Sequence, residues 1–216
     1  MVERVKTAGQ RTPSSTRWLA RQLNDPYVQR ARREGFRSRA AYKLRELDAR
    51  FHLMRPGMRV VDLGAAPGGW TQVAVAAVKA PQKGRVVALD IAPMQPVAGA
   101  RILTLDFWAA EAPAALVAAL GGAADLVLSD MAAPATGHAG TDHLRIVALA
   151  EAAHEFARTV LAPGGAFVAK LYQGGAGTAF LAALKRDFAS VRHAKPPASR
   201  AESAELYIVA QGFRAA

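Results

Sequence analysis

The residues of this chain most able to carry out chemistry are three charged side chains at the ends of predicted β-strands. Asp130 follows one apolar run, Lys170 lies inside a second, and Glu205 opens a third. A lysine among apolar residues is costly to bury as a cation unless it is paired. Burial and a neighbouring cation weaken its hold on the proton, whereas nearby carboxylates strengthen it. Lys170 is therefore predicted to act on a proton, either as a base or as an orienting cation, and the residues alone leave both roles open.

Each of these residues has a simpler interpretation when it is considered alone. Lys170 could extend to solvent from an edge strand. Asp130 could cap the segment that follows it, and Glu205 could be an ordinary exposed acid at the start of a strand. The chemical interpretation depends on convergence of the three, so it depends on the elements that position them.

A glycine-rich turn indicates where a ligand would bind. Residues 60–70 read Val-Val-Asp-Leu-Gly-Ala-Ala-Pro-Gly-Gly-Trp, which predicts a strand, a tight turn and a helix start. Glycine lets a ligand approach the backbone closely because it has no Cβ. The spacing is neither G-x-G-x-x-G nor a P-loop, so a bound phosphate is not favoured. Asp62 would repel a phosphate and attract a cation, such as the sulfonium of S-adenosylmethionine.

Two further acids end predicted strands and favour a nucleoside ligand. Asp90 follows the glycine turn by about twenty residues, the offset at which an acid binds ribose hydroxyls. NAD-dependent enzymes use the same acid, so Asp90 alone does not separate the two ligands. Asp106 suits an adenine amino group, with Phe107 or Trp108 near the face of the ring. Three strands that each end in an acid favour S-adenosylmethionine.

The elements that would position these residues alternate between strands and helices. Strands are predicted at 58–63, 85–91, 101–105, 124–129, 166–171, 189–194 and 205–212, and helices at 17–35 (broken at 24–26), 38–54, 68–79, 110–120, 142–161 and 177–187. Ser38 is expected to be the N-cap of the helix at 38–54. This alternation predicts a Rossmann-like α/β fold with a doubly wound, mostly parallel seven-stranded sheet. No helix separates the last two strands, so the last strand is expected to be antiparallel.

Basic charge gathers at the beginning of the chain. Of the 216 residues, 1–59 contain 15 lysines and arginines against 5 acids, whereas the remainder contain 13 against 12. Such a block indicates a polyanionic partner, although a solvated basic arm is the simpler alternative. Trp18, Tyr27, Phe36 and Tyr42 are interleaved with it and are expected to stack on unpaired bases. We therefore predict a basic extension over 1–37 that contacts a nucleic acid, followed by a nucleoside-binding α/β domain over 38–216.

Composition excludes several other classes of protein. The chain has no cysteine, so it has neither disulfides nor thiolate chemistry. Its five histidines lack the spacing of metal ligands, so no metal is expected. No apolar run is long enough to cross a bilayer, and no signal peptide opens the chain. A cytoplasmic monomer that does not bind membranes is expected.

These motifs together resemble the FtsJ/RrmJ family of ribosomal RNA ribose 2′-O-methyltransferases. The resemblance is carried by Gly64–Trp70, Ser129–Pro134, the segment 38–44, Lys170 and Glu205, and it covers about residues 25–213. It implies an RNA-binding extension over 1–37 and a methyltransferase domain over 38–216. Within that domain it implies a catalytic tetrad of Lys43, Asp130, Lys170 and Glu205. It also implies cofactor contacts by Gly68, Trp70, Asp90, Asp106 and Asp130. Ala133 departs from the family pattern, which puts the loop contacts after Asp130 in question.

The resemblance implies transfer of a methyl group from S-adenosylmethionine to the ribose 2′-hydroxyl of a uridine in large-subunit (23S) ribosomal RNA, within the assembled 50S subunit. In this scheme Lys170 takes or steers the hydroxyl proton and Asp130 orients Lys170. Lys43 disfavours the charged form of Lys170 and holds the sugar, while Glu205 fixes Lys43 or the hydroxyl. The alternatives are a methyltransferase of tRNA or mitochondrial rRNA, an NAD(P)-dependent oxidoreductase, and a non-catalytic RNA-binding factor in ribosome assembly.

Overall fold

The computed structural model describes residues 7, 9, 12–134, 136–174 and 177–215, and it gives no placement for the side chain of Trp18. Its strands form one seven-stranded sheet in the order β3-β2-β1-β4-β5-β7-β6. Their bounds are β1 Arg59–Leu63, β2 Arg85–Asp90, β3 Ala100–Thr104, β4 Ala124–Ser129, β5 Leu161–Tyr172, β6 Phe188–Ala194 and β7 Glu205–Phe213.

The direction of each strand places the predicted site residues at one edge of the sheet. Strands β1 to β5 run parallel to one another, and β7 is inserted antiparallel between β5 and β6. The carboxyl ends of parallel strands therefore meet the amino end of β7. In this register Lys170 lies opposite Tyr207, and Tyr172 lies opposite Glu205. The predicted Rossmann-like fold with its antiparallel last strand is confirmed.

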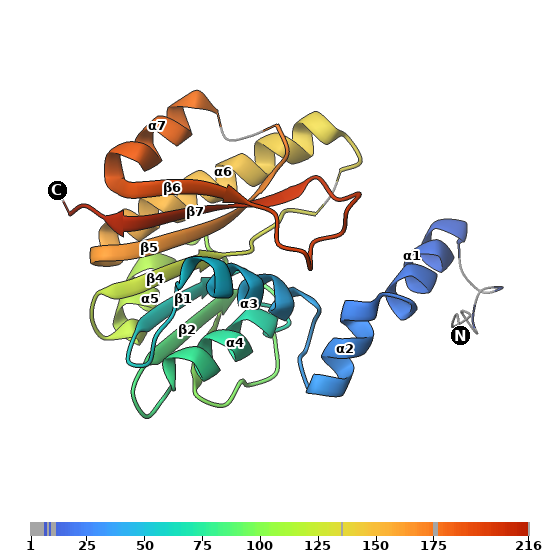
Figure 1. Ribbon diagram of the computed structural model, residues 1–216, viewed down its shortest axis with the longest axis horizontal. Helices are drawn as coiled ribbons and strands as arrows, with labels where there is room; N and C mark the ends of the chain where they lie inside the picture. Colours follow the sequence, from blue (N-terminus) through green and yellow to red (C-terminus); the bar gives the residue numbers. More distant parts are fainter. Residues whose placement is uncertain (1–6, 8, 10–11, 135, 175–176, 216) are drawn as a thin grey trace.

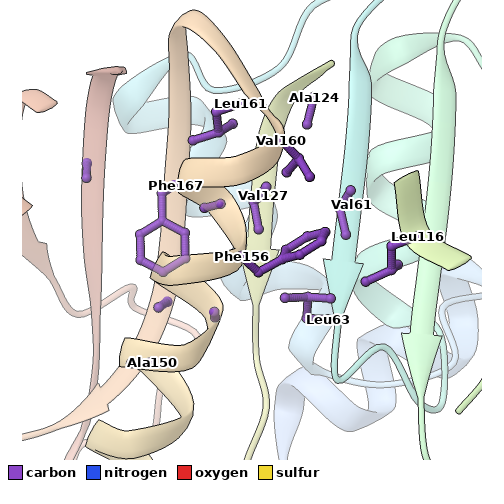
Figure 2. Packing of buried hydrophobic residues seen from close by; sticks show 14 of the residues in the cluster. Val61, Leu63, Leu116, Ala124, Val127, Ala150, Phe156, Val160, Leu161 and Phe167 are labelled. Carbon is purple, nitrogen blue, oxygen red and sulfur yellow. The ribbon is translucent and has the colours of Figure 1, made fainter. Parts of the chain in front are cut away.

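Helices cover both faces of the sheet (Figure 1). The helices are α1 Pro13–Leu23, α2 Pro26–Glu34, α3 Ala40–Phe51, α4 Gly69–Val78, α5 Ala112–Leu120, α6 Ala139–Val160 and α7 Thr178–Asp187. One hydrophobic core joins α5, α6 and α7 to the sheet, and a second joins α3 and α4 to its other face. Figure 2 shows Phe156 of α6 packed against Val61 and Val127 of the central strands. Within the described residues, no helix is long and apolar enough to span a membrane.

The glycine turn after β1 lies against the end of β4. Gly64 has a φ of 73°, and a Cβ there would lie 2.7 Å from the Cα of Met131. Gly68 has a φ of 107°, and a Cβ there would lie 3.0 Å from Arg37 Nη1. Both positions therefore require glycine, for backbone conformation and for space. The close approach brings the turn next to Asp130.

The amino-terminal helices are attached to the sheet domain through Asp25. Its side chain accepts hydrogen bonds from the first backbone N–H groups of α2, which caps that helix. It also forms ion pairs with Arg39 and Arg200, from two distant parts of the chain. Figure 1 shows α1 extending away from the body of the protein.

Two expectations for this region are wrong. Tyr27 and Phe36 pack against Tyr42, with ring centroids 5.4 and 5.6 Å from it, and Tyr42 is only 3% exposed. Tyr42 is therefore part of a small core and not a surface on which bases stack. Ser38 does not cap α3; that helix begins after Arg39, and the Ser38 hydroxyl has no hydrogen-bond partner among the described residues. The Trp18 side chain lies outside the described part of the chain, so its expected role is untested.

Candidate active site

A cavity of about 640 Å³ opens at the carboxyl ends of β1, β2 and β4. We call it the donor cavity, and its polar lining consists mainly of Asp90, Asp106, Asp130, Arg145 and Lys170. Its apolar lining comes from the glycine turn, from the segment 106–108, from the loop 131–134 and from α6. Ala133 and Pro134 are among these residues, so the departure from the family pattern lies in the wall of the cavity.

The predicted cofactor contacts divide into two groups. Asp90 Oδ2 accepts a 2.8 Å hydrogen bond from the Ala66 N–H, which ties the acid to the glycine turn. Asp106 Oδ1 accepts a 3.0 Å hydrogen bond from the Trp108 N–H, which leaves its second oxygen for a ligand. Gly68 and Trp70 do not line the cavity. The Trp70 indole is 3% exposed and donates to the Ala40 carbonyl, so its side chain supports the turn from within the core.

Asp62 lies beneath the donor cavity and does not reach it. Its carboxyl is fully buried, and Oδ2 accepts a 2.6 Å hydrogen bond from the Thr71 hydroxyl. Burial raises the pKa of Asp62 to about 7, and the charges of Asp130 and Asp90 add to the effect. The expectation that Asp62 attracts a cationic ligand directly is therefore wrong, because it supports the turn from below.

The first ion pair of the tetrad borders the donor cavity. Lys170 Nζ lies 3.1 Å from Asp130 Oδ1 and donates a 2.5 Å hydrogen bond to the Asp130 carbonyl. Lys170 is 9% exposed. It therefore does not extend to solvent from an edge strand. Its two contacts with Asp130 leave one direction of the three-donor ammonium group for a ligand.

The second ion pair lies at the start of β7. Lys43 Nζ is 2.6 Å from Glu205 Oε1, and Ser199 donates a 2.9 Å hydrogen bond to the same oxygen. Burial alone would raise the pKa of Glu205, but Lys43 and Lys170 outweigh it and bring that pKa below its ordinary value. Glu205 is therefore ionised, and the simpler interpretation of Glu205 as an ordinary exposed acid is wrong.

Tyr207 connects the two ion pairs and was missed by the sequence analysis. Its hydroxyl lies 2.9 Å from Asp130 Oδ1 and 3.2 Å from Glu205 Oε1. Burial, together with these two carboxylates, raises the pKa of Tyr207 well above its ordinary value, so the hydroxyl keeps its proton. The available signal was spacing, because residues two apart on a strand face the same side. All four predicted tetrad residues thus belong to one hydrogen-bonded cluster with Tyr207 at its centre.

A second cavity, of about 370 Å³, opens on the other side of the cluster. We call it the basic cavity, and it is lined by Arg21, Gln22, Arg39, Lys43, Arg200, Glu202, Ser203 and Glu205. Arg21 and Gln22 come from α1, so the amino-terminal extension forms part of this wall. The cluster therefore separates a cavity rich in acids from one rich in arginines.

Comparison with known proteins agrees with this geometry. Residues 36–213 match the model of the FtsJ-like methyltransferase family. The chain belongs to that family. The predicted family and the prediction of a methyltransferase are therefore confirmed.

Individual relatives extend over nearly the whole chain. The chain is 62% identical to a ribosomal RNA large subunit methyltransferase E from Rhodospirillum rubrum, covering 98% of this chain and 81% of the relative. A protein of the same description from Paramagnetospirillum magneticum is 61% identical, with 98% and 88% covered. Among solved structures, a Plasmodium falciparum protein described as a ribosomal RNA methyltransferase superposes with a TM-score of 0.74 at 28% identity, covering 84% of this chain and all of that one.

Proposed function

We propose that this protein transfers a methyl group from S-adenosylmethionine to a ribose 2′-hydroxyl in large-subunit ribosomal RNA. One observation carries the proposal: the cluster of Lys43, Asp130, Lys170 and Glu205 lies between an acid-lined cavity and an arginine-lined cavity. A cationic donor fits the first cavity and a polyanionic substrate fits the second. The relatives described as large subunit methyltransferases support the choice of RNA.

The donor cavity fits S-adenosylmethionine in its chemistry. Asp90 would bind the ribose hydroxyls and Asp106 the adenine amino group, with Trp108 beside the ring. Gly64 and Ala66 line the cavity at the turn, so a ligand there lies beside backbone that carries no large side chain. S-adenosylmethionine, when bound, supplies an electrophilic methyl group on a sulfonium. The chain must then position a hydroxyl and manage its proton.

Lys170 and Asp130 position the hydroxyl. We assign the free direction of the Lys170 ammonium to the ribose oxygen, because its other two contacts go to Asp130. Asp130 keeps Lys170 in place and adds negative charge beside the cationic donor. Positioning a nucleophile in line contributes a large part of the rate of such a transfer. As an ammonium, Lys170 steers the hydroxyl by donating to its oxygen. To act as the base and take the hydroxyl proton as the new bond forms, Lys170 must first release one of its own protons to solvent.

Lys43 and Glu205 face the substrate side. Glu205 is ionised and fixes Lys43, whose ammonium also lines the basic cavity. We assign Lys43 to the ribose or its phosphate. Tyr207 joins this pair to Asp130, so a displacement on either side changes the geometry of the other.

We propose that residues 1–37 form an RNA-binding extension of the methyltransferase domain at 38–216. Arg21 supports this role because it lines the basic cavity from α1. The rings of Tyr27 and Tyr42 attach the extension, so its arginines, and not these rings, would contact RNA. We further propose that the protein acts in the cytoplasm on a uridine of the assembled subunit.

Transfer of radioactive methyl groups tests the proposal. The protein is incubated with methyl-labelled S-adenosylmethionine and unmodified large subunits, protein-free large-subunit rRNA, small subunits or tRNA. We expect label in large-subunit rRNA, in a dinucleotide that resists alkaline hydrolysis because its 2′-oxygen is methylated. Label only in tRNA would overturn the assignment of large-subunit rRNA as the substrate. Label on a base would overturn the 2′-O assignment, and binding of rRNA without transfer would indicate a non-catalytic assembly factor.

A further inference from the structure

The amino-terminal edge of the sheet carries another basic cavity, far from the cluster. We call it the amino-edge cavity; it has a volume of about 600 Å³. Arg59, Lys83, Arg85 and Arg101 are among its lining residues, and none of the residues that line it is acidic. All four of these cations are exposed. The charged side chains that line this concave surface are therefore all positive.

The arginines are neighbours in the sheet and lack acidic partners. Arg59 and Arg85 open adjacent parallel strands and lie directly opposite each other in register. Like charges in that relation are destabilising. Among the described residues, no salt bridge joins any of these cations to a carboxylate. Asp125 reaches this edge, but it accepts a hydrogen bond from the Arg59 backbone N–H and not from the guanidinium.

The guanidinium groups of two of these arginines lie against a turn that has no side chains. Arg85 Nη1 donates a 3.0 Å hydrogen bond to the Leu120 carbonyl, and a Cβ at Gly121 would lie only 2.4 Å from that nitrogen. A Cβ at Gly122 would lie 3.2 Å from Arg59 Cζ. Both arginines thus lie across the two glycines. The hydrogen bond to Leu120 restrains Arg85, which lowers the conformational entropy that a ligand would have to remove at that side chain.

A phosphate bound in the amino-edge cavity cannot also reach the active site. Strand β2 runs from Arg85 at this edge to Asp90 at the donor cavity, a span of roughly 17 Å at about 3.3 Å per residue. The antiparallel strand β7 ends at the amino edge, and Figure 1 shows the C-terminus on the side away from α1 and α2. A ligand at this edge is therefore a different segment from the one that reaches the basic cavity.

We propose that the amino-edge cavity binds the phosphodiester backbone of large-subunit rRNA at a segment distinct from the one that carries the target ribose. The inference rests on the proposed function for the identity of the RNA. Arginines bind phosphate through two parallel N–H donors, and a phosphate backbone neutralises several cations at once. A second contact of this kind favours a large folded RNA over a short fragment that carries the same target.

The test compares pairs of charge-removing substitutions. The edge variant is R59Q/R85Q, and a second edge variant, K83Q/R101Q, alters side chains for which the structure shows no hydrogen bond. The matched control, K185Q/R192Q, removes the same charge from exposed positions on α7 and β6. Affinity for protein-free large-subunit rRNA is measured over a range of KCl concentrations. Methylation is measured on that RNA and on a short hairpin containing the mapped target.

We expect each edge variant to lower the slope of log Kd against log salt by about 1.4 to 1.8, because each of the two lost phosphate contacts contributes roughly 0.7–0.9. The kcat/KM for large-subunit rRNA should fall by the same factor as the affinity, while that for the hairpin stays at the wild-type value. If the R59Q/R85Q protein does not fold, K83Q/R101Q decides the question.

Three results would overturn the inference. The first is a salt slope that is unchanged in the edge variants, and the second is an equal fall of that slope in K185Q/R192Q. The third comes from melting temperatures measured with and without inorganic phosphate: the edge variants lose a stabilisation by phosphate that the wild-type protein shows, while their binding of rRNA is unchanged. The last result would mark a site for small anions. If the wild-type protein methylates no RNA, the proposed function fails, and the salt slopes still test the amino edge.

Discussion

The donor cavity and the basic cavity meet at one cluster but differ in the charge that surrounds them. The donor cavity has three acids, Asp90, Asp106 and Asp130, against two cations. The basic cavity has four cations against two acids. A ligand with a positive centre and a polymer of phosphates can therefore approach the same atoms from opposite sides. The difference indicates that the two proposed substrates would be separated by charge before any specific contact forms.

The cluster itself keeps this division. The pair of Asp130 and Lys170 borders the donor cavity, and the pair of Lys43 and Glu205 borders the basic cavity. Tyr207 is the one residue among the described contacts that bonds to a carboxylate of each pair. Substitutions on the two sides should therefore affect different binding constants, while substitutions in the cluster should affect the rate.

The largest effect is expected from Lys170→Ala. This change removes the group that faces the hydroxyl, so kcat should fall by roughly 10²- to 10⁴-fold. The affinity for S-adenosylmethionine, measured by calorimetry, should change less than about threefold, since a cation does not attract a sulfonium. Lys185→Ala, an exposed lysine on α7, is the matched control.

The pH–rate profile of Asp130→Asn then separates the two roles of Lys170. If Lys170 is a base, removing the neighbouring carboxylate weakens its hold on the proton, and the rising limb should move to lower pH. A limb that stays in place would leave Lys170 as an orienting cation. Methylation by Lys170→Ala at a rate near wild type would contradict both roles.

The second effect concerns the protonation of Asp62 beneath the donor cavity. Asp62 has a pKa of about 7 in the folded protein and 3.8 ordinarily. Between about pH 4 and pH 7 the native state keeps a proton that the unfolded chain releases, so the free energy of unfolding falls as pH rises through this window. The fall is about 4 kcal/mol in total and levels off above pH 7.

Asp62→Asn should remove that pH dependence. Urea unfolding at pH 4 and pH 8 measures it: the difference between variant and parent should move by about 4 kcal/mol in favour of the variant. Asp106→Asn, an exposed acid at the same edge, serves as the control and should show little of this change. A difference between Asp62→Asn and parent that is constant with pH would show that Asp62 is ionised when buried.

Much of the fold could be predicted because the relevant signals are local. The strand at 124–129 was predicted at its observed bounds, and most other elements agree within a few residues. Strand β5 was predicted too short, since it begins at Leu161 directly after α6. Its pairing with β4 shifts between Ala124 and Leu126, where the residues Pro163-Gly164-Gly165 interrupt the ladder. Such a bulge depends on the neighbouring strand, which the local pattern does not contain.

The part of the site that residue types and family motifs identify could be predicted from the sequence. The tetrad residues do converge, because they stand at strand ends that the topology brings together. Tyr207 was missed because a tyrosine in an apolar run resembles an ordinary core residue, and only its spacing from Glu205 places both side chains on one face of β7. Asp62 was misplaced for the opposite reason: an acid before a glycine turn suggests exposure, and only the packing of Thr71 over it shows burial.

A third effect should appear only on the donor side. Asp90→Asn replaces a carboxylate that accepts the Ala66 N–H and lines the donor cavity. A hydrogen bond to a charged acceptor contributes about 1.5–3 kcal/mol, so the affinity for S-adenosylmethionine should fall by roughly 10- to 100-fold. Affinity for rRNA should be unchanged. An equal loss of both affinities would mean that the two cavities are not separate sites.

The smallest effect should appear only on the substrate side. Arg21→Gln removes one exposed cation from the wall of the basic cavity. The slope of log Kd for rRNA against log salt should fall by about 0.7–0.9, as for one phosphate contact, with the affinity for S-adenosylmethionine unchanged. Arg17→Gln is the control, because Arg17 is exposed on the same helix but does not line the cavity. If Arg17 and Arg21 contribute equally to the salt slope, α1 acts only through its net charge. The position of Arg21 in the wall of the basic cavity would then have no separate effect on RNA binding.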